Sequence, residues 1–110
     1  MFRREEKTLL VGSIEKATAL RGWLRRKAEM GLRTVGIICE EPAGKMIDNI
    51  PVLGGADRFR GAIQEHGVTQ VIMLEFPQFT DLTRNLIATC DQLGVRLLMV
   101  SDLEENSAIR

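Results

Sequence analysis

The chain contains no tyrosine and only two cysteines among its 110 residues. Without tyrosine, the tyrosine–lysine proton-transfer pair of a nicotinamide-dependent dehydrogenase cannot form within this sequence. Cys39 and Cys90 lack the close spacing of metal ligands, and we interpret them as small buried side chains in a protein of a reducing cytoplasm. These absences argue against a dehydrogenase active site and against a cysteine-ligated metal centre.

The sequence also lacks an excess of charge and any long hydrophobic run. Fifteen basic and fifteen acidic residues give a net charge of zero, which argues against a general nucleic-acid binder. The longest apolar stretches, such as residues 96–100, have the length of a strand and fall far short of the ~20 residues that span a bilayer. We expect residues 1–110 to form one globular domain with no membrane span of its own.

Two of the three glycines of a dinucleotide-binding turn are missing as well. Residues 8–17 read as a strand, a glycine turn and a helix, the layout in which G-x-G-x-x-G binds a pyrophosphate. The three glycine positions hold Gly12, Ile14 and Ala17. Alanine is tolerated at the third position, whereas the branched side chain of Ile14 stands where a phosphate would meet bare backbone. The turn therefore indicates the fold more strongly than it indicates a cofactor.

Short β-branched runs alternate with helical periodicity along the whole chain, which predicts an α/β fold. The expected strands are residues 7–11, 33–39, 51–53, 70–74 and 95–100, and the expected helices are residues 14–30, 57–66 and 80–93, with Thr80 as an N-cap. Residues 40–49 read as an exposed loop. Right-handed crossovers then predict a Rossmann-like, doubly wound, five-stranded parallel sheet of order 3-2-1-4-5, with helices on both faces.

This topology places a ligand crevice beyond the carboxyl ends of the first and fourth strands. Its candidate cofactor-binding residues are Gly12, Ser13, Ile14, Ala17, Glu40, Gly54, Gly55 and Glu75, and we expect Cys39 and Phe76 beside them. Glu75 would repel a pyrophosphate by a few kcal/mol at about 4–6 Å in a partly desolvated cleft. Glu75 and Ile14 thus both argue against tight dinucleotide binding.

Several runs along the chain are similar to one bacterial family. They are Leu10-Val11-Gly12, Val35 to Pro42, Ile50 to Gly55, Glu65 to Val68 and Gly94-Val95-Arg96. Together they resemble the cytoplasmic nucleotide-binding-like domain of polyprenyl-phosphate sugar-1-phosphate transferases, and related domains occur in membrane-bound nucleotide-sugar dehydratases. The resemblance extends from about Lys7 to Leu103.

The resemblance implies that this chain is a fragment of a larger enzyme of the bacterial inner membrane, which transfers sugar-1-phosphate to undecaprenyl phosphate for exopolysaccharide or capsule synthesis. In that family the acidic residues after the second strand and the glycine pair after the third correspond here to Glu40 with Glu41 and to Gly54 with Gly55. NAD(P) or a nucleotide sugar is the implied ligand. Glu75 departs from the small or neutral residue that is usual at its position.

Three functions remain open at the level of sequence. The first is a non-catalytic regulatory or scaffolding domain of such a transferase, with the rest of the parent as its partner. The second is the cofactor domain of a nucleotide-dependent oxidoreductase or nucleotide-sugar dehydratase. The third is an oligomerisation module that uses Trp23, Phe76 and Phe79.

One basic segment suggests a further partner. Residues 14–33 include six basic and two acidic side chains, among them Arg21, Arg25, Arg26, Lys27 and Arg33. Such a segment is commonly a solvated helix end. It would also suit an anionic membrane surface, where each basic residue contributes about 1 kcal/mol.

Overall fold

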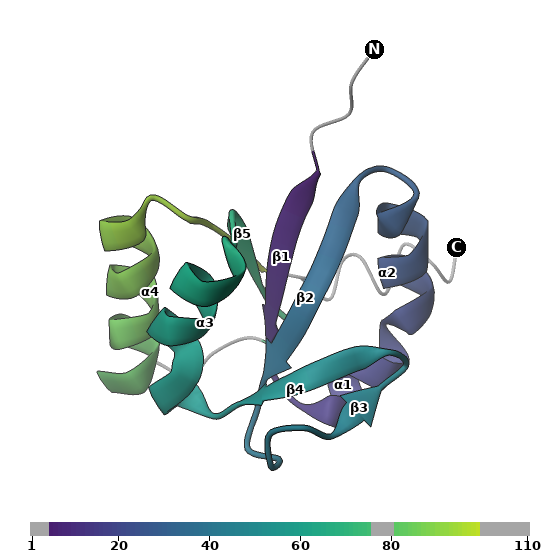
Figure 1. Cartoon of the computed structure of the whole chain (residues 1–110), viewed down its shortest axis with the longest axis horizontal. Coiled ribbons are helices and arrows are strands. Elements are labelled where there is room, and N and C mark those ends of the chain that lie inside the picture. Colours follow the sequence, from purple (N-terminus) through teal and green to yellow (C-terminus); the bar gives the residue numbers. More distant parts are fainter. Residues whose placement is uncertain (1–4, 76–80, 100–110) are drawn as a thin grey trace.

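Five parallel strands form the centre of the molecule (Figure 1). The computed structural model describes residues 5–75 and 81–99. The strands are β1 (Glu6–Val11), β2 (Leu32–Ile38), β4 (Ile50–Gly54), β5 (Gln70–Met73) and β6 (Arg96–Met99). They lie in the spatial order β4-β2-β1-β5-β6, and every neighbouring pair is parallel. The predicted doubly wound α/β class and the order of its five parallel strands are confirmed.

A sixth strand differs from the prediction. Residues 40–49 were expected to form a loop, but they include β3 (Met46–Ile47), which pairs antiparallel with β4 at the edge of the sheet. Asp48 and Asn49 form the two-residue turn between β3 and β4, with φ angles of 48° and 69°. Asp and Asn tolerate this left-handed conformation better than other non-glycine residues, which explains why a hairpin closes here.

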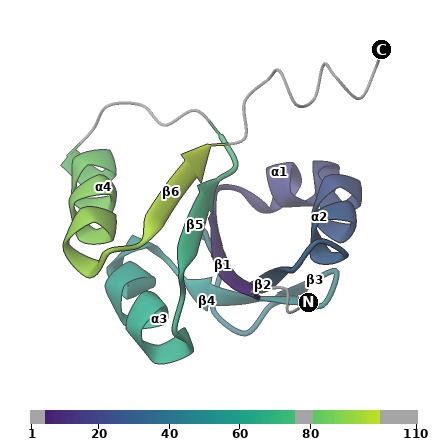
Figure 2. The same ribbon diagram turned by 90° about the horizontal axis from the view of Figure 1, so that it is seen from above.

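The helices cover both faces of the sheet (Figure 2). On one face lie α1 (Ile14–Ala19) and α2 (Arg21–Ala28), and on the other lie α3 (Phe59–His66), which follows a 3-10 turn η1 (Ala56–Arg58), and α4 (Asp81–Leu93). The prediction of one helix over residues 14–30 was wrong, because Leu20, at φ −97° and ψ 7°, interrupts it. Gly67 ends α3 in the left-handed conformation, as expected. The predicted N-cap Thr80 lies outside the described residues.

Alternating side chains of the strands build one apolar core on each face. Leu9 and Val71 pack with Phe59, Ala62, Ile63, Leu86 and Cys90 beneath α3 and α4. Leu10 and Ile72 point the other way and pack with Ala17, Leu20, Leu24, Ile37 and Val52 beneath α1 and α2. The consecutive residues 8–10 of β1 and 70–73 of β5 are thus all buried, as expected for a parallel sheet that is covered on both faces.

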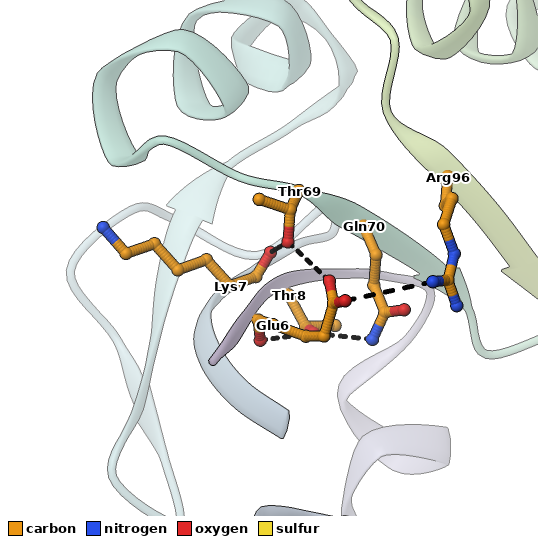
Figure 3. A network of polar contacts seen from close by, with 6 residues as sticks. All are labelled: Glu6, Lys7, Thr8, Thr69, Gln70 and Arg96. Atoms are coloured by element: carbon orange, nitrogen blue, oxygen red, sulfur yellow. Dashed lines mark hydrogen bonds and ion pairs between the residues drawn. The ribbon is translucent and has the colours of Figure 1, made fainter. Parts of the chain in front are cut away.

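A polar network joins β1, β5 and β6 at the amino end of the sheet (Figure 3). The buried Gln70 amide donates from Nε2 to Thr8 Oγ1 over 3.0 Å, and Thr8 Oγ1 donates to the Glu6 carbonyl over 3.1 Å. The Thr69 hydroxyl donates to Glu6 Oε2 over 2.8 Å, and Arg96 lies 3.9 Å from the other oxygen of that carboxylate. The network links the strands at the end opposite to the predicted crevice.

Candidate functional site

A cavity of about 420 Å³ lies at the carboxyl ends of β1 and β2, beside the point between β1 and β5 where the strand order reverses. Ligands of open α/β sheets bind at such a reversal. Its walls come from the turn after β1, the end of β2, the second residue after β5 and the start of α4. The lining residues are Val11, Gly12, Ser13, Ile14, Ile38, Cys39, Glu40, Glu41, Glu75 and Leu82. We call this cavity the crevice.

The crevice brings together five of the eight predicted cofactor-binding residues. They are Gly12, Ser13, Ile14, Glu40 and Glu75. The other three lie elsewhere: Ala17 is buried beneath α1, and Gly54 and Gly55 do not line the cavity. Their role in binding a ligand stays a prediction, and the expected neighbour Phe76 lies outside the described residues.

Ser13 and Glu75 close the position where a phosphate would bind. The Ser13 side chain caps α1 by accepting a hydrogen bond from the Lys16 N–H over 3.1 Å. The Ser13 N–H itself donates to Glu75 Oε1 over 2.9 Å. A carboxylate of the protein thus takes the place at the helix start that a phosphate oxygen takes in a dinucleotide site.

Two further backbone groups at the β1–α1 turn form hydrogen bonds within the protein. The Gly12 N–H donates to the Ile38 carbonyl over 3.2 Å, and the Leu74 N–H donates to the Val11 carbonyl over 2.8 Å. A Cβ on Gly12, whose φ is 157°, would lie 2.9 Å from Leu74 Cβ. Gly12 therefore meets a structural need of the β1–α1 turn, independent of any ligand.

Gly54 also has a structural explanation. Its φ is 133°, and a Cβ added there would lie 2.6 Å from Arg58 Cγ. Its carbonyl accepts a hydrogen bond from the Cys39 N–H over 3.0 Å, which ties the end of β4 to the end of β2. The glycine pair thus shapes the turn into η1 and leaves Gly55 in an extended conformation at the start of that turn.

The charge of the crevice has one sign. Glu40, Glu41 and Glu75 line it, and none of its lining residues is basic. Three carboxylates around a cavity of this size repel a diphosphate, whose binding sites normally supply backbone N–H groups or cationic side chains.

The lining of the crevice also includes Glu41 and Leu82, which are not among the predicted cofactor-binding residues. Glu41 carried a sequence signal through the acidic pair before Pro42, whereas Leu82 carried none.

The Cys90 thiol is not an activated nucleophile. Cys39 and Cys90 are both free and buried. Burial raises the pKa of the Cys90 thiol, which keeps it in the unreactive protonated form at neutral pH. Within residues 5–75 and 81–99 there is also no cluster of three side chains suited to a metal ion. None of the helices described for this chain is long and apolar enough to cross a bilayer.

Solved structures identify the fold. The chain is similar to RSP, a Rex-family repressor, with a TM-score of 0.70 and 14% identity over 96% of this chain and 57% of that chain. RSP has also been solved in complex with β-NADH, with the same TM-score. The fold is Rossmann-like. The chain spans little more than half the length of the repressor.

A second neighbour matches in length as well. UDP-D-quinovosamine 4-dehydrogenase from Vibrio fischeri has a TM-score of 0.69 and 15% identity, over 94% of this chain and 84% of that chain. CobK precorrin-6A reductase has a TM-score of 0.62 and 22% identity, over 87% of this chain and 39% of that chain. No protein-family model and no curated sequence matches the chain. At these identities the similarity establishes the fold.

Proposed function

We propose that this chain is a non-catalytic, nucleotide-binding-like domain that regulates or scaffolds a bacterial sugar-1-phosphate transferase of exopolysaccharide or capsule synthesis. The motif resemblance from about Lys7 to Leu103 supports the parent enzyme, and the Rossmann-like fold is the one that this resemblance implies. The domain would lie on the cytoplasmic side of the inner membrane, with the rest of the transferase as its partner.

The hydrogen bond from the Ser13 N–H to Glu75 carries the non-catalytic part of the proposal. It places a negative charge of the protein where a cofactor would place a phosphate, and Ile14 covers the same turn. Displacing Glu75 would cost its hydrogen bond and bring a second anion towards Glu40 and Glu41. We therefore expect the crevice of the natural chain not to bind a dinucleotide.

A second candidate is the cofactor domain of an oxidoreductase or nucleotide-sugar dehydratase. The cavity of about 420 Å³ beside the strand-order reversal supports it, because it falls within the usual size range of small-molecule sites. Its catalytic residues would belong to other parts of the parent. The oligomerisation alternative rests on Trp23, which is half-buried under Lys27, and on Phe76 and Phe79, which lie outside the described residues.

Differential scanning fluorimetry with NAD, NADP, UDP-glucose and coenzyme A tests the proposal. A ligand at 100 times its dissociation constant stabilises a protein by about 2.7 kcal/mol, which is readily visible as a higher melting temperature. We expect no shift for the natural chain with any of the four. A shift with NAD or NADP would favour the cofactor-domain candidate instead.

A gain-of-binding variant sharpens this test. Replacing Ile14 with Gly and Glu75 with Ala frees the Ser13 N–H and removes one carboxylate, so we expect a measurable shift with a dinucleotide. The matched control is the Ile14→Gly, Glu65→Ala variant, which removes an equal charge at an exposed position on α3. Equal responses of the two variants would show that Glu75 does not block the site.

A further inference from the structure

A second cavity of the described chain lies away from the crevice. It is a groove of about 580 Å³ between α2 and the β3–β4 hairpin. Figures 1 and 2 both place this hairpin on the side of α1 and α2. Its apolar lining residues include Ala17, Leu24 and Ile50. Three arginines, Arg21, Arg25 and Arg33, line it together with two acidic residues, Glu5 and Asp48. We call this cavity the basic groove.

The groove occupies a position that a helix fills in other sheets of this type. In a βαβαβ half, a helix joins the second strand to the third on the same face as the first helix. Here the corresponding connection, residues 39–49, contains only the two-residue strand β3. No helix of this connection therefore lies beside α2, and a cavity is left between α2 and the hairpin.

The wall formed by α1 and α2 matches a helical partner. Ala17, Arg21, Leu24 and Ala28 follow one another at steps of four, three and four residues, and all of them line the groove. The last three form a stripe on α2 that is about 10 Å long, and Ala17 adds to it from α1, on the other side of the helix break at Leu20. The small side chains of Ala17 and Ala28 let a second helix approach closely.

The three arginines that line the groove favour an acidic partner. Arg21 is exposed and makes no hydrogen bond or ion pair with any residue that the structure describes. Arg25 donates to Asp48 over 2.9 Å and Arg33 donates to Glu5 over 2.9 Å, both at the surface. Exposed ion pairs contribute at most about 1 kcal/mol, so incoming carboxylates can share or replace their partners.

We propose that the basic groove binds an acidic amphipathic α-helix of a partner protein. Its apolar side would lie on Leu24 and Ile50, and its carboxylates would pair with Arg21 and Arg25. The concave shape favours a helix over a flat bilayer surface. The proposal concerns a different site from the crevice and does not depend on whether a nucleotide binds there.

Fluorescence anisotropy with a labelled synthetic peptide tests this. The probe is an amphipathic peptide of about 14 residues, with leucines at steps of three and four and glutamates beside them. We expect saturable binding to the full chain that weakens with added salt. A peptide in which lysines replace the glutamates should not bind. No saturable binding of the acidic peptide, or equal binding of both, would overturn the proposal.

Two variants of α2 provide the matched comparison. Arg21→Glu should lower the affinity at least about tenfold, a change of about 1.4 kcal/mol. Arg26→Glu makes the same charge change at an exposed position of the same helix that does not line the groove, and it should change the affinity less than about twofold. Equal loss in both variants would overturn the proposal. Ala28→Trp, which fills the groove without changing charge, should also abolish binding.

Anionic vesicles separate the groove from a membrane-binding surface. Vesicles of phosphatidylserine and phosphatidylcholine would contact the exposed basic residues of α2 together. Vesicle binding that Arg21→Glu and Arg26→Glu weaken equally, with no binding of the acidic peptide, would replace the proposed helix with a membrane surface.

Discussion

At each end of the sheet a hydrogen bond links the chain at β1 to the chain at β5, but the two bonds differ in burial. At the amino end, Gln70 and Thr8 are buried and hydrogen-bonded to each other. At the carboxyl end, Glu75 is exposed and accepts from the Ser13 N–H beside an open cavity. A buried polar pair is costly to break, whereas an exposed carboxylate can exchange with water or a ligand. The contact at the amino end is thus fixed, whereas the Glu75 contact at the carboxyl end is one that a ligand or a substitution can change.

The strongest test of this comparison is Gly12→Ala at the carboxyl end. The new Cβ would meet Leu74 Cβ at 2.9 Å in a backbone conformation that alanine rarely adopts. We expect a loss of about 3 kcal/mol in the free energy of unfolding, measured by urea denaturation. Gly22→Ala is the control, because Gly22 lies in α2 with space around it and should gain up to about 1 kcal/mol. Little loss in Gly12→Ala would show that the turn is free to serve a ligand.

At the amino end, Thr8→Val should cost about 2 kcal/mol of stability. Valine has the same shape but leaves the buried Gln70 amide without its acceptor. Urea denaturation again measures the effect, and Thr8→Ser, which keeps the hydroxyl, should lose less. If serine and valine were equally destabilising, packing rather than the hydrogen bond would account for the role of Thr8.

The smallest expected effect is that of Ser13→Ala. Removal of the side-chain cap of α1 should lower the free energy of unfolding by about 1 kcal/mol. The backbone bond from residue 13 to Glu75 would remain. Thermal denaturation with and without the Glu75→Ala change measures both contributions, and a double variant no less stable than Ser13→Ala would contradict the role we give to Glu75.

The sequence predicted the sheet more completely than it predicted the site. The five parallel strands followed from β-branched runs and from the handedness of crossovers, which are properties of short segments and of chain connectivity. The helix break at Leu20 was missed because the apolar spacing continues through it, from Ala17 to Leu24, without proline or glycine at the break. Periodicity reports which face is buried and is insensitive to a local change in ψ.

The hairpin and the crevice show two further limits. The Asp48-Asn49 turn carried a local signal, since both residue types tolerate positive φ, but the pairing of β3 depends on its contact with β4. The bond between Ser13 and Glu75 joins residues 62 positions apart. The sequence placed both at the same edge of the sheet and predicted repulsion of a phosphate, but it did not predict that Glu75 would bond the turn itself.

The β3–β4 hairpin also affects whether a strand of another molecule can pair with the edge of this sheet. β3 pairs with β4 through only two residues. One of their partners on β4, Pro51, has no N–H that could donate a hydrogen bond. At the opposite edge, β6 pairs only with β5 within the described part of the chain. A two-residue edge strand offers few backbone groups to a strand of another molecule, so the hairpin protects its own edge of the sheet against edge-to-edge association.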